Sequence, residues 1–143
     1  MTISFGECLK RGLINHHPRD PDSVERELAG ARSDLQDARD NYERGKYLWA
    51  TVQSYYSMFH AARAALYHEG YREKSHQCIE AFLEKLASEG RLDRRFADYY
   101  IAVRHLRESA NYTLTFSEGN AAFAIRSAAE FEERMRTVIG RNL

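Results

Sequence analysis

The chain has 143 residues, of which 43% are hydrophobic and 29% charged, with 21 basic and 21 acidic side chains. A chain of this length can bury a core without disulfides or metal, and its formal charge of zero excludes a uniformly basic nucleic-acid-binding domain. The charge is unevenly spread, because residues 19–44 carry five basic and eight acidic groups, whereas residues 91–107 carry five arginines and two aspartates. Any contact with phosphate is therefore expected to be local.

The composition also bears on compartment and domain organisation. The N-terminus lacks the apolar core of a signal peptide, and no apolar run reaches the roughly 18 residues of a membrane span. We therefore predict a cytoplasmic protein with no membrane contact. Cys8 and Cys78 form no CxxC pair, so we expect two small buried thiols in a reducing compartment, with neither a disulfide framework nor a zinc site. The chain is interpreted as a single domain over 1–143, with an N-terminal helix and linker over 1–21 and a helical bundle over 22–141.

The elements follow from apolar spacing and from caps, in chain order. A short helix over about 4–14 precedes a polar linker that contains Pro18 and Pro21. Asp22 or Ser23 is then expected to cap a helix that stops at Gly45. Further helices are predicted over 47–68, from a cap at residue 75 to a stop at residue 90, over about 93–115, and after the turn at 117–120. The segment 47–68 is apolar around most of its circumference, which is typical of a buried central helix.

No segment shows the alternation of a strand, and no internal repeat appears. Successive helices joined by short loops favour an antiparallel arrangement. The sequence therefore predicts an all-α fold, an antiparallel up-and-down helical bundle of four to five helices plus a short N-terminal helix.

Two groups of polar side chains occur at helical spacing. Tyr56, His60 and Arg63 stand at i, i+4 and i+7 on the central helix, where the alternative is ordinary amphipathic packing. Arg104, Arg107 and Asn111 share a face of the fifth helix, from which arginines could grip phosphate oxygens. For this second row the alternative is surface ion pairing, with Arg104 beside Glu108 four residues on.

The histidines do not form a recognisable metal site, because the sequence contains neither the Glu-x-x-His pairs of di-iron bundles nor an HExxH motif. Gly-rich phosphate loops and G-x-S-x-G are also absent. We therefore predict no metal and no cofactor.

Three segments together resemble the HEPN domain (higher eukaryotes and prokaryotes nucleotide-binding), in particular its small stand-alone prokaryotic members. They are Ser-Tyr-Tyr-Ser-Met-Phe-His-Ala-Ala-Arg-Ala-Ala-Leu at 54–66, Lys-Ser-His at 74–76, and Arg-Glu-Ser-Ala-Asn-Tyr at 107–112. The resemblance implies a helical bundle that forms a homodimer, often paired with a minimal nucleotidyltransferase in a toxin–antitoxin module. It also implies, for active members, metal-independent cleavage of RNA by an Arg that holds phosphate and a His, four to six residues further on, that transfers protons.

This chain departs from that catalytic motif, because no histidine stands at the required distance after Arg104 or Arg107. His105 corresponds to the polar neighbour of the arginine, so His60 or His76 could act only if the fold brings them to the cleft. The catalytic candidates are Arg107, Arg104, His105 and His60. The candidates for binding nucleotide or phosphate are Arg104, Arg107, Asn111, Tyr112, Tyr56, His60, Arg63 and His76.

The leading interpretation is an HEPN-type protein that binds nucleotide or RNA, as a homodimer and together with a minimal nucleotidyltransferase partner, with a degenerate catalytic motif. One alternative is a metal-independent endoribonuclease toxin. The other is a non-catalytic structural or adaptor bundle.

Overall fold

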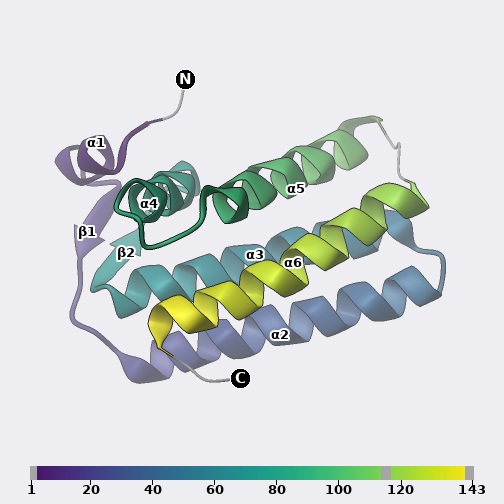
Figure 1. The fold of residues 1–143 in the computed structure, drawn as a ribbon, viewed down its shortest axis with the longest axis horizontal. Coiled ribbons are helices and arrows are strands. Elements are labelled where there is room, and N and C mark those ends of the chain that lie inside the picture. The colour runs from purple at the N-terminus through teal and green to yellow at the C-terminus, as the bar shows by residue number, and fades with distance from the viewer. Residues whose placement is uncertain (1–2, 114–116, 141–143) are drawn as a thin grey trace.

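The computed structural model describes residues 3–113 and 117–140, with side chains outside 110–113. Helices account for most of this part of the chain, and two short strands complete it (Figure 1). The elements are α1 (Phe5–Lys10), β1 (Ile14–His16), α2 (Pro21–Glu43), α3 (Tyr47–His68), β2 (Tyr71–Glu73), α4 (Gln77–Ser88), α5 (Arg94–Thr113) and α6 (Glu118–Ile139).

The helix α3 lies at the centre of the bundle, in contact with α2, α4, α5 and α6. Most of its side chains are buried, as its broad apolar circumference predicts. Fully buried aromatic and aliphatic side chains from the neighbouring helices complete the core, among them Leu28, Phe82, Tyr100 and Phe131. The predicted all-α antiparallel bundle with a short N-terminal helix is confirmed.

At the ends of α2, the predicted C-terminal stop agrees with the structure, whereas the predicted N-terminal cap does not. Gly45 takes a left-handed φ of +74° after α2, a conformation that glycine adopts without strain. At the other end of α2 the cap is Asp20, whose carboxylate accepts a hydrogen bond from the main-chain N–H of Asp22. The helix starts earlier than predicted because Pro21 fits the first turn of a helix.

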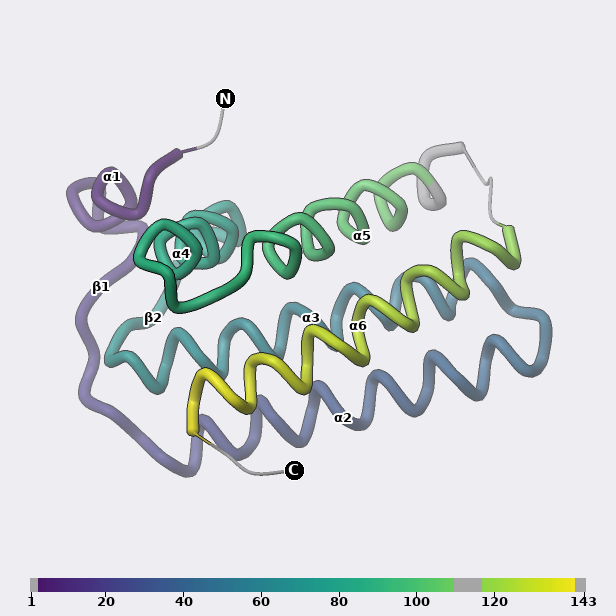
Figure 2. Tube along the Cα trace, in the orientation of Figure 1, coloured from purple at the N-terminus to yellow at the C-terminus, as the bar shows by residue number. Residues whose placement is uncertain are grey.

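The two strands were not expected from the sequence. β1 pairs antiparallel with β2, with Ile14 opposite Glu73 and His16 opposite Tyr71. Three residues are too few to show an alternating pattern, so pairing between segments far apart in the chain creates these strands. Figure 2 shows the chain returning to this end of the bundle after α3.

The two cysteines form a disulfide, which corrects the expectation of separate thiols. The sulfur atoms of Cys8 and Cys78 lie 2.17 Å apart, their Cα atoms are separated by 6.1 Å, and both residues are fully buried. A separation of 70 residues hid this proximity in the sequence, because it results from packing of α1 against α4. Among the described helices, none combines the length and apolar character needed to cross a membrane.

Candidate functional site

A cavity of about 390 Å³ lies where α3, α4, α5 and the N-terminal segment meet. Its volume could hold a phosphate group with part of an attached sugar or base. Both arginines of the second predicted row line it, together with the histidine at the N-cap position of α4. The lining residues are Ile3, Tyr55, His76, Gln77, Glu80, Arg104, Arg107 and Glu108.

Arg104 is neutralised inside this cavity by two carboxylates. Its Nε lies 2.5 Å from Oε2 of Glu80 on α4, and its Nη1 lies 2.8 Å from Oε1 of Glu108 on its own helix. Burial lowers the pKa of Arg104, but hydrogen bonds to both carboxylates and their charges outweigh burial and raise it above its ordinary value. The ion pair with Glu108 is the alternative left open by the sequence, whereas Glu80 was not foreseen.

Arg107, one turn further along α5, is held by aromatic side chains instead. Its Nη2 donates a hydrogen bond of 3.1 Å to the hydroxyl of Tyr56, and its guanidinium carbon lies 5.4 Å from the ring centroids of both Tyr55 and Tyr56. Among the described residues, no carboxylate lies within 4.0 Å of this guanidinium, and its buried Nε has no hydrogen-bond partner. The tyrosines therefore position the cation without cancelling its charge.

His76 brings an imidazole to the wall of the same cavity. Its ring centroid lies 4.5 Å from that of Phe59, and the residue is exposed. His76 stands at the start of α4, whereas Arg107 stands late in α5, so the fold brings a histidine and an arginine from distant parts of the sequence to the wall of one cavity. The imidazole is therefore accessible to a molecule that enters the cavity.

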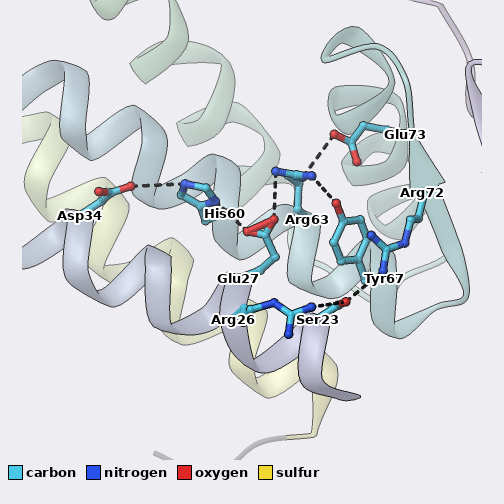
Figure 3. Close-up of polar contacts among 9 residues, drawn as sticks. All are labelled: Ser23, Arg26, Glu27, Asp34, His60, Arg63, Tyr67, Arg72 and Glu73. Atoms are coloured by element: carbon cyan, nitrogen blue, oxygen red, sulfur yellow. Dashed lines mark hydrogen bonds and ion pairs between the residues drawn. The ribbon is translucent and has the colours of Figure 1, made fainter. Parts of the chain in front are cut away.

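His60 does not line the cavity and belongs to a polar network between α2 and α3 (Figure 3). Its Nδ1 lies 2.8 Å from Glu27 and its Nε2 lies 3.5 Å from Asp34. The hydrogen bond to Glu27 raises the pKa of His60 above its ordinary value; burial opposes this rise, and the charges of Glu27 and Asp34 reinforce it. Gly30 on α2 faces the imidazole, and a Cβ atom at this position would lie 3.5 Å from the ring of His60.

Arg63 continues the same network toward β2. It makes ion pairs of 2.9 Å with Glu27 and 3.2 Å with Glu73, and it donates a hydrogen bond to the hydroxyl of Tyr67. The three residues predicted to share one face of α3 therefore lie in two environments. Tyr56 contacts α5, whereas His60 and Arg63 contact α2 and β2. The interpretation of Arg63 as a phosphate ligand receives no support from these contacts, because its cation is already paired.

The remaining predicted residues lie outside the cavity lining or outside the described side chains. His105 is exposed on α5 and does not line the cavity. The side chains of Asn111 and Tyr112 lie outside the described residues, so their predicted roles stay predictions. Sequence reasoning missed Tyr55 and Glu80; Tyr55 adjoins Tyr56 in the quoted motif, whereas nothing in the spacing of Glu80 marks it as a partner of α5. Within the described part of the chain, no group of three or more His, Cys, Asp or Glu side chains is arranged to hold a metal ion.

Comparison with known proteins agrees with this arrangement of helices and motifs. The chain is 26% identical over 123 residues to a UPF0332 protein of Archaeoglobus fulgidus, an alignment that covers 85% of this chain and 98% of that protein. The model of the HEPN domain family matches residues 24–138. This range is most of the chain and contains every residue that lines the cavity except Ile3. The chain therefore belongs to the HEPN domain family.

Proposed function

We propose that this protein binds the phosphate of a nucleotide or of RNA in the cavity, with Arg107 as the principal phosphate ligand. The observation that carries the proposal is the state of the Arg107 guanidinium, which is held by two tyrosines and has no carboxylate partner among the described residues. An oxyanion would accept charge-assisted hydrogen bonds from this guanidinium, including one from the Nε of Arg107, which is buried and has no hydrogen-bond partner among the described residues.

Arg104 would provide a second contact to the phosphate by exchanging one of its two carboxylate partners for a phosphate oxygen. The side chain of Glu108 is 41% exposed, whereas that of Glu80 is 12% exposed. A phosphate oxygen would displace the more exposed Glu108 and leave the ion pair to Glu80 intact. The two arginines and two carboxylates of the cavity cancel formally. We therefore expect modest affinity and a shallow salt dependence, with a log–log slope of roughly −0.7 for each RNA phosphate engaged.

The direct test compares Arg107→Ala with Arg95→Ala, which removes the same charge from an exposed position on the same helix. Binding of fluorescently labelled single-stranded RNA and of a labelled nucleotide is measured at low salt, and circular dichroism checks that helicity is preserved. A charge-assisted contact contributes about 1.5–3 kcal/mol, so we expect Arg107→Ala to weaken binding roughly tenfold to a hundredfold. Arg95→Ala should bind like the wild type. Equal effects of the two substitutions would refute Arg107 as the ligand.

A second function, metal-independent cleavage of RNA, is favoured by the presence of both His76 and Arg107 in the wall of one cavity. In this mechanism the imidazole removes the proton of the RNA 2′-hydroxyl, which attacks the adjacent phosphorus while Arg107 holds the phosphate oxygens. Cleavage that persists with chelator and is lost in both His76→Ala and Arg107→Ala would support it. Intact RNA after incubation with stoichiometric protein would exclude it and leave binding as the function.

The proposal includes assembly as a homodimer, together with a minimal nucleotidyltransferase partner in a toxin–antitoxin-like module in the cytoplasm. Membership of the HEPN family and the resemblance of the three motifs support this setting. Equilibrium ultracentrifugation should show a dimer, and co-purification should recover a nucleotidyltransferase encoded beside this chain. A monomer at all concentrations would argue against a composite cleft, and a stable complex without RNA or nucleotide binding would favour the adaptor role.

A further inference from the structure

The N-terminal arm, defined here as residues 3–16, adds a separate element to the domain. It precedes the residues that match the family model, which begin at residue 24. The arm contains α1 and β1 and lies at the end of the bundle where α4 begins (Figure 1). Its first described residue, Ile3, forms part of the wall of the Arg107 cavity.

Noncovalent contacts attach this arm together with the disulfide, because Phe5 and Ile14 belong to the hydrophobic core, and Ile3, Leu9 and Leu13 pack against it. Phe5 packs edge-on against Tyr71 with ring centroids 5.2 Å apart and lies 6.2 Å from the ring of Phe82. Ile14 is fully buried, and β1 contributes three residue pairs to the two-stranded antiparallel sheet with β2. A six-residue helix such as α1 is not stable by itself, so its position depends on these contacts and on the covalent bond from Cys8.

The disulfide joins the arm to the cavity at a defined place. Cys78 directly follows His76 and Gln77, the N-cap and the first residue of α4, which both line the cavity. Cys8 stands five residues after Ile3, which lines the cavity from the N-terminal arm. A bond between the two sulfurs therefore holds Ile3 and the first turn of α4 in a fixed relation.

We propose that Cys8 and Cys78 form a redox-controlled clasp, which holds the N-terminal arm in the cavity wall when oxidised and releases the arm when reduced. Opening is a thiol–disulfide exchange. A thiolate of a small thiol such as glutathione attacks one sulfur, which breaks the bond between Cys8 and Cys78, forms a mixed disulfide and releases the other cysteine as a thiolate. A second small thiolate then attacks the small-molecule sulfur of this mixed disulfide and releases the second cysteine. The two cysteine thiolates take up the protons that the small thiols gave to water, leaving two protein thiols and one small-molecule disulfide. Closing is the reverse, with oxidised glutathione as the two-electron oxidant.

Burial of both sulfurs ties this chemistry to movement of the arm. Neither cysteine is accessible to solvent, so a thiolate reaches the disulfide only when α1 lifts from α4. In a reducing compartment such a bond is poised for regulation rather than for permanent stabilisation. Reduction would remove the Ile3 side of the wall and so widen access to Arg107; this consequence rests on the proposed phosphate-binding function.

Hydrogen–deuterium exchange of the full chain tests the clasp without any ligand. Oxidised protein should protect the amides of residues 5–16, and reduction with dithiothreitol should speed their exchange at least about tenfold while the amides of α3 stay protected. Cys8→Ala should exchange like the reduced wild type with or without reductant, and Cys78→Ala repeats the test should that variant fail to fold. Equal exchange of the arm in both redox states would overturn the proposal, as would a response of Cys8→Ala to dithiothreitol.

Association kinetics with labelled RNA test the effect on the cavity. The association rate constant should rise on reduction of the wild type and should be raised already in oxidised Ile3→Ala. An unchanged rate, with the arm shown to be released, would overturn the link between the clasp and the cavity. Absence of RNA and nucleotide binding in every redox state would instead refute the proposed function, while a redox-dependent exchange of the arm would still support the clasp.

Discussion

Replacement of Glu27 by Gln should destabilise the protein in a pH-dependent manner. The carboxylate lies between two cations, 2.8 Å from His60 and 2.9 Å from Arg63, and its side chain is 14% exposed. Arg63 keeps a second partner in Glu73, whereas His60 keeps only the longer contact with Asp34 among the described residues. We expect a loss of about 2 kcal/mol in the free energy of unfolding at a pH where His60 is protonated, the scale of a charged hydrogen bond that loses one partner.

The sign of the pH dependence follows from the direction of the shift. The pKa of His60 is raised in the folded protein above its ordinary value of 6.5, chiefly by the hydrogen bond that its imidazole donates to Glu27. The stabilisation is therefore fully present below pH 6.5 and is lost as the pH rises through the raised folded-state pKa. The difference between wild type and Glu27→Gln should thus be larger at about pH 5.5 than at about pH 8.5.

Urea denaturation followed by circular dichroism at both pH values measures this difference. Glu133→Gln is a matched control, because it removes the same charge from an exposed position on α6, and it should change stability by less than about 0.5 kcal/mol. His60→Gln should abolish most of the pH-dependent part of the Glu27→Gln effect. A cost of Glu27→Gln that is equal at both pH values, or greater at alkaline pH, would refute the assignment of the stabilisation to protonated His60.

Three further substitutions or treatments have outcomes set by local geometry. Reducing the bond between Cys8 and Cys78, which closes a loop of 70 residues, should lower the free energy of unfolding by about 4 kcal/mol on the chain-entropy model, measured by urea denaturation with and without reductant. Gly30→Ala should raise stability by about 0.5–1 kcal/mol in the same assay, because its new methyl group would lie 3.5 Å from the ring of His60, an ordinary contact, and alanine favours a helix; a lower stability would show that the imidazole cannot accommodate it. Ser57→Ala should cost about 1 kcal/mol, because the buried hydroxyl donates a 2.7 Å hydrogen bond to a main-chain carbonyl of α2, and an unchanged midpoint would refute a stabilising role for that bond.

The two predicted polar rows show which features of the site can be predicted from the spacing of residues along a helix. It placed Arg104 and Arg107 on one helix face, and both line one cavity. Their different states depend on partners elsewhere: Glu80, on another helix, neutralises Arg104, whereas tyrosines of α3 surround Arg107. Spacing along one helix contains no information about which charged side chains a second helix places nearby. The sequence therefore could not predict that Arg104 is paired with carboxylates and Arg107 is not.

The first row, on α3, also shows a limit of helical spacing, because residues on one face of a helix can contact different neighbouring helices. Tyr56, His60 and Arg63 share one face of α3, but that face spans the boundary between two neighbours, α5 and α2. A single face can therefore contribute to two separate environments, one a cavity and the other a packed ion-pair network. The interpretation of His60 and Arg63 as ligands treated the face as one surface.

By itself, the sequence determined the number and order of the helices, because apolar periodicity, glycine stops and caps are local signals that persist within each segment. It also determined the family, through motifs on three successive helices. Only the tertiary structure decided which of the two cavity arginines is paired, that His76 and Arg107 line the same cavity, and that Cys8 meets Cys78 across 70 residues. These contacts depend on how helices pack against one another. A net charge of zero therefore does not describe the cavity, where Glu80 and Glu108 pair with Arg104, while Arg107 has no carboxylate partner among the described residues.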